Sequence, residues 1–171
     1  REAVGLSGKD GGLIRAKKMI GEGEFKNVDF KHTGMVQSID PSVVSLLDKT
    51  AFIPVIAPIG IGNDHKTYNI NADIVAGKIA HILEAGKYVI LTNTTGILDE
   101  KGNLIKSINA KKVKSLIQKD IISGGMLPKI ESALEAVNSG VESVQIIDGT
   151  IDHSILLELF TDEGIGTMIR R

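Results

Sequence analysis

The sequence contains no cysteine and no tryptophan among its 171 residues. Without cysteine, disulfides, thiolate metal ligands and cysteine nucleophiles are excluded. The same absence fits a reducing compartment, so we expect a cytoplasmic protein. Aromatic residues make up only 4% of the chain, which argues against the stacked aromatic platforms that bind single-stranded nucleic acid. A net charge of -1 also offers no basic surface for nucleic acid.

Several common motifs are missing as well. No apolar run approaches the ~18 to 20 residues of a membrane span, so we expect no membrane partner. Gly8-Lys9 and Gly77-Lys78 lack the glycine spacing of a P-loop, and no GxGxxG motif follows a predicted strand. The histidines are scattered without HExxH-like spacing, and no residue is therefore assigned to a metal site.

The composition is that of a globular protein with one substantial core, because hydrophobic residues make up 42% and charged residues 24%. Apolar, often β-branched runs predict strands at 3–6, 13–20, 32–39, 52–57, 88–92, 144–147 and 165–169. Helical spacing and capping residues predict helices that begin at Asp40-Pro41, after Asn71, at Asn109, at Gly124-Gly125 and at His153. This alternation predicts an α/β fold with a mainly parallel central sheet sandwiched by helices.

Glycines and turn residues predict the connections. A turn at 8–12 would join the first two strands as a hairpin, and a second turn at 99–102 would lie within a hairpin region at 93–108. Gly86 and Gly140 stand where a glycine would end the preceding helices. The apolar run at 52–57 is typical of a buried strand.

The stretch YNINADIVAG places Asn69, Asn71 and Asp73 at alternate positions where a strand gives way to a helix. Alternate residues of a strand point to one side, so the three side chains could converge on a small ligand. The carboxyl end of a strand is also where open α/β sheets bind ligands. The ordinary interpretation is equally open: Asn71 caps the helix and Asp73 complements its dipole, although this leaves Asn69 unexplained.

The stretch GGMLPK, 124–129, is a second candidate site. Two glycines at the start of a helix leave backbone N–H groups free to approach an anion, and Lys129 could reach the same anion. A lysine so near a helix N-terminus opposes the helix dipole, so a function would explain its presence. The alternative is a surface lysine that follows a flexible loop.

The stretch LTNTTGIL is a third candidate. Thr92 and Asn93 follow an apolar strand, as in loops that line nucleotide pockets. Small polar residues are equally typical of ordinary connections after a buried strand.

In this order along the chain, these motifs resemble the acetylglutamate kinases of the amino acid kinase family. The matching pieces are GLSGKDGGLI, FIPVIAPIGIG, YNINAD, LTNTTGIL, GGMLPK and HSILLELFTDEGIGTMI. The resemblance covers essentially the whole chain and implies the amino acid kinase or carbamate kinase-like fold. Residues 1–66 would form the end of the acetylglutamate-binding lobe with β-hairpins, and residues 67–171 the ATP-binding lobe of one continuous α/β domain.

The resemblance implies transfer of the γ-phosphoryl group of ATP to the side-chain carboxylate of N-acetyl-L-glutamate, a step of arginine biosynthesis. Mg²⁺ would be bound through the phosphates of the nucleotide. Asn69 and Asn71 match asparagines that bind the acetylglutamate. Asp73 matches an aspartate that organises the active-site lysines, and Lys129 matches the lysine that stabilises the transferring phosphoryl group.

Two further groups of residues follow from the resemblance. The nucleotide pocket would be formed by Thr92, Asn93, Gly124, Gly125 and Met126. The C-terminal piece is similar to that of the arginine-inhibited members, in which arginine binds near the last helix. Glu158 and Gly164 match positions used there, so arginine is an expected effector.

The family's first glycine-rich loops and its arginine for the substrate's α-carboxylate are not found in this sequence, which opens at Arg1. We therefore expect a fold that is incomplete at the N-terminus, a 171-residue chain that is inactive alone, and a homo-oligomer for the full-length protein. The alternative is a non-catalytic regulatory module that binds nucleotide or arginine on the same fold. Retention of both Asp73 and Lys129 favours the kinase.

Overall fold

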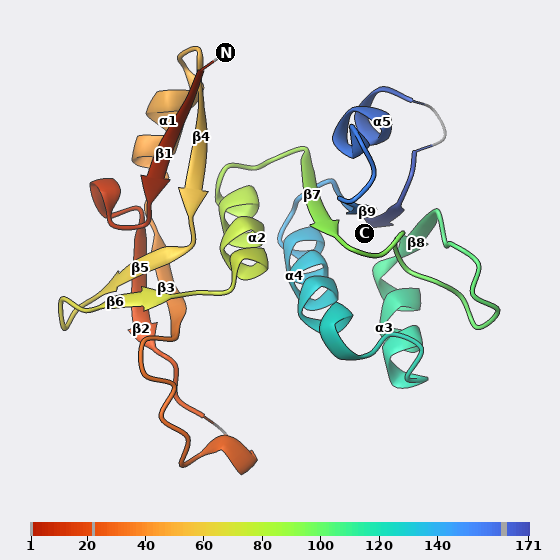
Figure 1. The fold of residues 1–171 in the computed structure, drawn as a ribbon, viewed down its shortest axis with the longest axis horizontal. Helices are drawn as coiled ribbons and strands as arrows, with labels where there is room; N and C mark the ends of the chain where they lie inside the picture. Colours follow the sequence, from red (N-terminus) through yellow and green to blue (C-terminus); the bar gives the residue numbers. More distant parts are fainter. Residues whose placement is uncertain (1, 22, 162–163) are drawn as a thin grey trace. The chain divides into compact units, whose positions relative to one another are not determined.

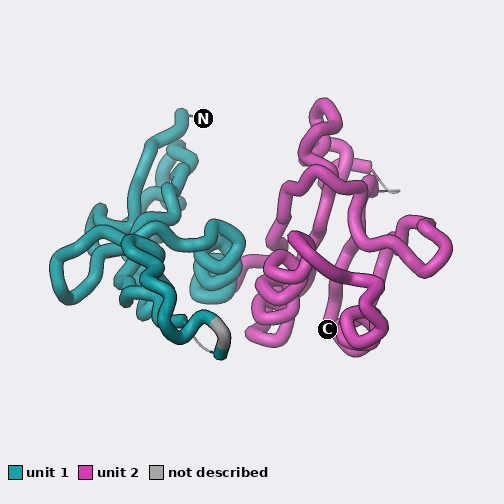
Figure 2. The backbone as a smooth tube through the Cα atoms, turned by 60° about the horizontal axis from the view of Figure 1, so that its bottom comes forward, with its two compact units in different colours: residues 1–83 teal, residues 84–171 magenta. Residues whose placement is uncertain are grey.

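The computed structural model describes residues 2–21, 23–161 and 164–171. The chain divides into two compact units, residues 1–83 and 84–171 (Figure 2). The division follows the helix after Asn71, and so lies later than the lobe boundary expected between residues 66 and 67. No sheet is shared between the units among the described residues, and each unit is described by itself.

Unit 1 contains a two-stranded parallel sheet and a four-stranded mixed sheet (Figure 1). The parallel sheet pairs β1 (Glu2–Ser7) with β4 (Phe52–Ala57), and α1 (Ser42–Asp48) packs against β4. The mixed sheet has the strand order β3 (Gly34–Ile39), β2 (Ile14–Lys18), β5 (Ile59–Gly62), β6 (Thr67–Asn69). The buried core of this unit is formed by Leu13, Ile14, Ala16, Val44, Tyr68, Ile70 and Val75.

The hairpin predicted around the turn at 8–12 is wrong, because β1 and β2 lie in different sheets. β1 pairs with β4, whereas β2 pairs with β3 and β5. Between β1 and β2 the chain makes the short 3-10 turn η1 (Asp10–Gly12), where Gly11 and Gly12 have φ angles of +61° and +70°. The glycines thus provide a crossing from one sheet to another rather than a hairpin turn.

The strand β4 forms at the predicted residues, but the expectation that it is buried is wrong for the described part of the chain. Phe52, Ile53 and Val55 are 40%, 48% and 57% exposed. The apolar run therefore predicts the extended conformation correctly, but it does not predict whether both faces of the strand are covered by other elements.

The helix α2 (Ala72–Ile82) begins after Asn71, as the sequence predicts. It ends earlier than expected, because Glu84 adopts a left-handed φ of +50° and breaks the helix before Gly86 is reached. The prediction that Gly86 ends this helix is therefore wrong.

Unit 2 is built on one four-stranded sheet with the order β7 (Lys87–Thr92), β9 (Ser143–Asp148), β10 (Thr167–Arg170), β8 (Ser107–Asn109). β7 and β9 are parallel, and β10 is antiparallel to β9 but parallel to β8. The helices of the unit are α3 (Ala110–Gln118), α4 (Leu127–Asn138) and α5 (Ser154–Phe160). α4 packs against β7, β9 and β10, and α5 packs against β9.

Local signals in unit 2 are confirmed. The side chain of Asn109 caps α3 by accepting a 2.9 Å hydrogen bond from the Lys112 N–H. Gly140 follows α4 with a φ of +114°, and an antiparallel bridge between Leu98 and Leu104 forms the predicted hairpin. The α/β fold class with several parallel strand pairs is confirmed. No helix in the described ranges is both long enough and apolar enough to span a bilayer.

Candidate functional site

The junction between β6 and α2 presents the two predicted substrate asparagines at the surface. Burial alternates from Thr67 to Asn71, so that Tyr68 and Ile70 are buried while Asn69 and Asn71 are exposed. The alternation predicted for the asparagines is therefore confirmed. It does not extend to Asp73, which lies in the first turn of α2 and is partly buried.

Asn71 is the N-cap of α2, so this part of the ordinary interpretation is confirmed as well. Its Oδ1 accepts hydrogen bonds from the N–H of Asp73 at 2.8 Å and of Ile74 at 3.4 Å. Because the oxygen is occupied by the cap, the Nδ2 group of Asn71 is left to donate to something beyond the helix. A ligand at this position would therefore meet the Nδ2 group of Asn71 and not its Oδ1 atom.

The backbone on both sides of Asn69 is held in place. The Asn69 N–H donates to the carbonyl of His32 at 2.7 Å, and the Ile70 N–H donates to the carbonyl of Pro58 at 2.9 Å. A bridge between Thr33 and Asn69 brings the segment before β3 alongside β6. The exposed Asn69 side chain is thus presented from a fixed backbone.

The start of α4 has the features predicted from GGMLPK. The 3-10 turn η3 (Gly124–Met126) precedes the helix, and Gly124 has a left-handed φ of +58°. A Cβ added at Gly124 or Gly125 would meet no atom within 4 Å, so the backbone there faces open space. Lys129 lies in the first turn of α4 and is partly buried.

Thr92 is the last residue of β7 and lies beside the end of the parallel strand β9. Thr92 is in register with Asp148, and its carbonyl accepts a 2.8 Å hydrogen bond from the Gly149 N–H. Thr92 and the exposed Asn93 therefore lie at the carboxyl ends of two neighbouring parallel strands, the edge at which α/β sheets bind ligands.

Sequence reasoning missed Asp148 at this edge. Its carboxylate accepts hydrogen bonds from the Thr150 N–H at 2.8 Å and the Thr150 Oγ1 at 2.6 Å. These two bonds hold the pKa of Asp148 below its usual range, so it is ionised at neutral pH. An aspartate directly after the apolar run 144–147 was the signal that could have identified it.

Glu158 and Gly164, the two residues matched to the arginine site, lie close together. The Ile165 N–H donates to Glu158 Oε2 at 2.8 Å. Gly164 has a φ of +59°, and a Cβ added there would lie 3.0 Å from Glu158 Oε2. The left-handed backbone conformation favours a glycine at position 164, and the absence of a side chain leaves room for the Glu158 carboxylate.

The sheet next to α5 also contains an unsatisfied polar atom. Gln145 on β9 is 1% exposed, and its Nε2 donates to Ser143 Oγ at 3.0 Å. Its Oε1 has no hydrogen-bond partner among the described residues. A buried carbonyl oxygen without a donor is costly, so a ligand or water N–H or O–H group would be stabilised there.

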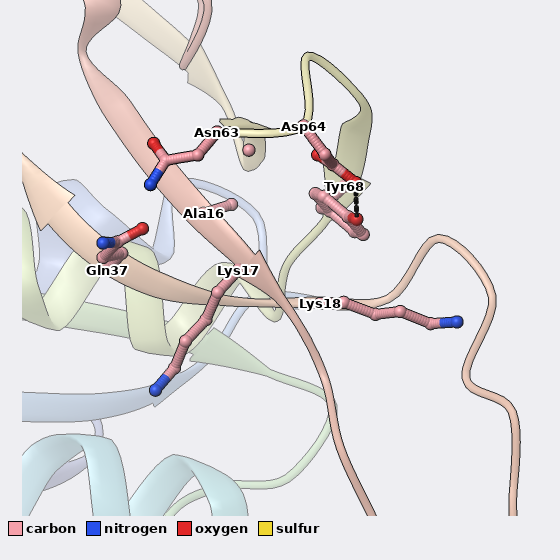
Figure 3. Close-up of a pocket in the computed structure, with 8 residues that line it drawn as sticks. Ala16, Lys17, Lys18, Gln37, Asn63, Asp64 and Tyr68 are labelled. Carbon is pink, nitrogen blue, oxygen red and sulfur yellow. Dashed lines mark hydrogen bonds between the residues drawn. The ribbon is translucent and has the colours of Figure 1, made fainter.

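A polar pocket of about 220 Å³ lies on the mixed sheet of unit 1 (Figure 3). Its lining includes Lys17, Gln37, Asn63 and the pair Asp64 and Tyr68. The Tyr68 hydroxyl donates to Asp64 Oδ2 at 2.7 Å. None of these residues was singled out from the sequence.

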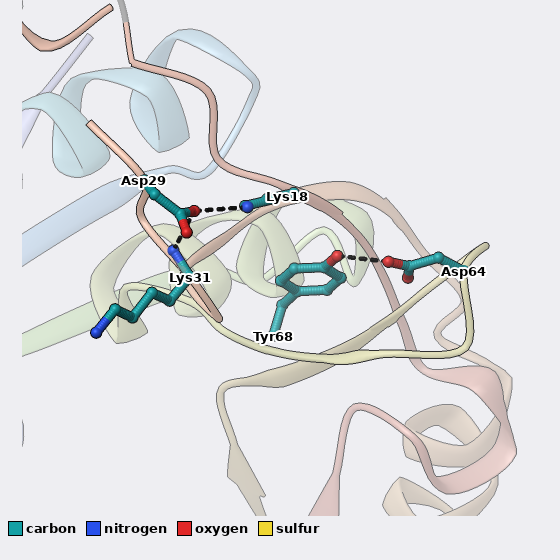
Figure 4. A network of polar contacts seen from close by, with 5 residues as sticks. All are labelled: Lys18, Asp29, Lys31, Asp64 and Tyr68. Atoms are coloured by element: carbon teal, nitrogen blue, oxygen red, sulfur yellow. Dashed lines mark hydrogen bonds and ion pairs between the residues drawn. The ribbon is translucent and has the colours of Figure 1, made fainter. Parts of the chain in front are cut away.

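An ion pair ties the segment before β3 to β2 (Figure 4). Lys18 Nζ lies 2.6 Å from Asp29 Oδ1, which also accepts a 3.0 Å hydrogen bond from the Lys31 N–H. These bonds hold the pKa of Asp29 below its usual range, first through Lys18 and then through Lys31. Within the described ranges, no three His, Asp or Glu side chains gather in a way that could hold a metal ion.

Comparison with known proteins identifies the family. The profile of the amino acid kinase family matches residues 2–148. An acetylglutamate kinase from Alkalilimnicola ehrlichii is 55% identical over 175 residues, covering 99% of this chain and 58% of that protein. This chain therefore spans little more than half the length of such curated relatives.

Solved structures agree with this assignment. An N-acetylglutamate synthase from Neisseria gonorrhoeae, complexed with coenzyme A and L-arginine, is 29% identical and has a TM-score of 0.84, covering 99% of this chain and 38% of its own. A carbamate kinase from Giardia lamblia, 18% identical with a TM-score of 0.61, covers 81% of this chain and 46% of its own and shares the fold. With the family profile matched over most of its length, the chain belongs to the amino acid kinase family.

Proposed function

We propose that the protein transfers the γ-phosphoryl group of ATP to the side-chain carboxylate of N-acetyl-L-glutamate, as a cytoplasmic enzyme of arginine biosynthesis. The 55% identity to an acetylglutamate kinase supports this proposal. So does the arrangement at the β6–α2 junction, where two exposed asparagines stand on a fixed backbone.

The observation that carries the proposal is the orientation of Asn71. Because its Oδ1 accepts the two N–H groups of the helix cap, its Nδ2 presents donors outward. A ligand at this position must therefore offer acceptors, as the carboxylate and acetyl oxygens of acetylglutamate do. Asn69, two residues earlier on the same exposed side, adds a second amide to the same binding surface.

The residues proposed for catalysis suit an anionic nucleophile. The accepting carboxylate is already ionised at neutral pH, so no general base is needed. Lys129 would cancel charge on the phosphoryl oxygens, and Asp73 would orient the lysines of the site. Catalysis would rest on in-line positioning and on this cancellation of charge.

The nucleotide is proposed to bind in unit 2, at Gly124, Gly125 and Met126 together with Thr92 and Asn93. The open backbone at the two glycines fits a phosphate group, since N–H groups at the start of the twelve-residue helix α4 favour an anion. When bound, ATP with Mg²⁺ on its phosphates supplies the phosphoryl group and part of the charge neutralisation.

Arginine is proposed as an inhibitor that binds near α5. Glu158 would pair with its guanidinium or amino group, and Gly164 would allow a close backbone approach. The solved N-acetylglutamate synthase that resembles this chain contains L-arginine, which supports the same ligand here. Homo-oligomerisation of the full-length protein remains part of this proposal.

A non-catalytic regulatory module that binds nucleotide or arginine is the second candidate, because the 29% identical synthase of the same fold was solved with L-arginine. Calorimetric titration separates the two possibilities. Binding of arginine without binding of ATP or acetylglutamate would favour the module. Binding of all three, together with ADP release, would favour the kinase.

The test of the proposed substrate is Asn71→Asp. An aspartate retains the oxygen that caps α2, but it replaces the outward donors by a negative charge that repels a carboxylate. We expect thermal stability within about 1 kcal/mol of the unsubstituted protein and a rise of about tenfold or more in the KM for acetylglutamate. Asn109→Asp, which changes the cap of α3 in the same way, is the matched control.

A coupled ADP-release assay gives the KM, and thermal unfolding gives the stability. An Asn71→Asp protein with an unchanged KM would remove Asn71 from the substrate site. Absence of acetylglutamate phosphorylation by the unsubstituted full-length protein would refute the proposed activity itself.

A further inference from the structure

Tyr68 is the one buried residue in β6 and the turn that precedes it, residues 63–69. It is 3% exposed, whereas the neighbouring residues of the turn and of β6, 63–67 and 69, are all exposed. Its ring is accommodated by two glycines from other strands. A Cβ added at Gly62 would lie 2.7 Å from Tyr68 Cε2, and one added at Gly34 would lie 2.6 Å from Tyr68 Cβ.

Neither of these glycines is explained by its own backbone. Gly34 and Gly62 do not have the positive φ angles that favour glycine. At position 34 a side chain is excluded chiefly by Tyr68, and at position 62 by Asp64 Oδ1 together with the Tyr68 ring. Gly34 in β3 and Gly62 in β5 thus form the space that Tyr68 of β6 occupies.

The hydroxyl of Tyr68 is fixed by the turn between β5 and β6 (Figure 4). Asp64 Oδ2 accepts the hydroxyl at 2.7 Å, while Asp64 Oδ1 accepts the Lys66 N–H at 3.1 Å. The Gly62 N–H closes the turn by donating to the Lys66 carbonyl at 2.9 Å. The Asp64 carboxylate therefore links the backbone of the turn, at Lys66, to the hydroxyl of Tyr68 in β6.

The geometry connects this ring to the predicted substrate residues. Tyr68 directly precedes Asn69 in a strand of three residues. Alternation places the ring on the buried side and Asn69 and Asn71 on the exposed side. A rotation or slide of β6 that moved the ring would move both amides with it, because the strand is short and the helix cap follows at once.

We infer that Tyr68 and Asp64 are positioning residues, whose hydrogen bond holds β6 so that Asn69 and Asn71 are aimed at the acetylglutamate. This inference rests on the proposed function. Since neither residue is proposed to touch the substrate, they act through the two asparagines alone.

The variants that test this inference are made in the full-length protein. They are Tyr68→Phe, which removes only the hydroxyl, and Asp64→Asn, which keeps an oxygen for the Lys66 N–H but replaces the charged acceptor of the hydroxyl by an amide. We expect each to raise the KM for acetylglutamate about three- to tenfold, less than the full effect of losing one hydrogen bond to a charged group, because the bond acts on the substrate only through Asn69 and Asn71. The kcat and the KM for ATP should remain within about twofold. The double variant should be no worse than either single one, because Tyr68→Phe removes the donor of this bond and Asp64→Asn replaces its charged acceptor by a neutral amide.

Asp99→Asn is the matched control. Asp99 also lies in a hairpin turn and accepts backbone N–H groups, those of Lys101 and Asn103 at 2.8 Å each, but in unit 2. It should leave the KM for acetylglutamate unchanged. A general loss of stability would instead lower kcat and the yield of folded protein in all three variants alike.

Amide hydrogen exchange provides a readout that does not depend on activity. The N–H groups of Asn69 and Ile70, which donate to His32 and Pro58, should exchange several-fold faster in Tyr68→Phe and Asp64→Asn than in Asp99→Asn. An unchanged KM for acetylglutamate in both variants overturns the inference. Unchanged exchange at both amides overturns it as well, since the bond would then not hold the strand.

The outcome for the proposed function is separate. If the unsubstituted full-length protein does not phosphorylate acetylglutamate, the proposed function fails and the positioning of that substrate fails with it. The exchange data would then still decide whether the Tyr68–Asp64 bond fixes β6.

Discussion

Lys129 carries the largest predicted catalytic effect of any single side chain. A cation in the first turn of a helix is electrostatically unfavourable, because the N-terminus of the helix already has a partial positive charge. A bound phosphoryl group would make the arrangement favourable, since the lysine and the positive end of the helix dipole would then attract the same anion. The proposed catalytic role would account for a lysine at this position of α4.

Replacement of Lys129 by alanine in the full-length protein should lower kcat by about a hundredfold or more, because charge on the phosphoryl oxygens is stabilised most in the transition state. The KM for acetylglutamate should change little. Steady-state kinetics with both substrates provide the measurement, and Lys114→Ala on the exposed face of α3 is the control. An unaltered kcat would show that Lys129 has no catalytic role.

Glu158→Gln tests the arginine site at the same scale. Glutamine keeps an oxygen that can accept the Ile165 N–H, so the local structure should survive, but the charge that would pair with arginine is lost. We expect the Kd for arginine to rise about tenfold or more, as for the loss of a charge-assisted bond. Titration calorimetry measures it, with the exposed Glu131→Gln on α4 as the control. Equal affinities in all three proteins would place arginine elsewhere.

At the scale of elements, the β5–β6 hairpin depends on the ionisation of Asp64. The hydrogen bond from Tyr68, followed by that from the Lys66 N–H, holds the pKa of Asp64 below its usual range. A lowered pKa in the folded state stabilises the fold above the unfolded pKa, and this contribution is lost as the pH falls through the folded value. The same bond raises the pKa of Tyr68, so the contribution from Tyr68 is lost only as the pH rises above about 10.

The hairpin should therefore keep its structure at neutral pH and loosen below about pH 4. The ring signals of Tyr68 in NMR spectra, followed from pH 7 to pH 2, report this change locally. Asp64→Asn should remove the acid transition from these signals, whereas Asp99→Asn should leave it unchanged. Tyr68 signals that do not respond to pH in the unsubstituted protein would contradict the prediction.

Most elements set by short-range chemistry could be predicted from the sequence, although Gly86 does not end α2, and strand pairings set by distant contacts could not. The caps at Asn71 and Asn109 and the glycine after α4 act within a few residues of their own helix, and all three are confirmed. The false hairpin after β1 arose because strand pairing is decided by residues far away, here those of β4.

In the candidate site, too, some features could be predicted from the local sequence and others depend on distant contacts. The outward direction of Asn69 and Asn71 follows from alternation along the chain. The part played by Tyr68 depends on Gly34 and Gly62, and the neighbourhood of Asp148 depends on the register between β7 and β9. Neither of these distant contacts leaves a pattern in the residues nearby.

At the scale of the whole molecule, we expect low catalytic activity from the 171-residue chain because it matches only part of its relatives. It covers 58% of the Alkalilimnicola acetylglutamate kinase, and the glycine-rich loops that the resemblance assigns to phosphate binding are not among its residues. A polypeptide of these 171 residues should therefore turn over at least about a hundredfold more slowly than such a relative, because groups that stabilise the transition state would be missing. A coupled ADP-release assay of the two proteins side by side tests this, and comparable turnover would contradict it.

The sheet of unit 2 is assembled out of chain order, since β10 lies between β9 and β8 although it comes last of the three in the sequence. β8 finds its partner only when residues 168–170 are available. During translation, the edges of β9 and β8 that pair with β10 therefore remain unpaired until β10 has left the ribosome. Proteolytic removal of this strand would open the sheet at an internal position and leave unpaired edges on both β9 and β8, where other chains could pair.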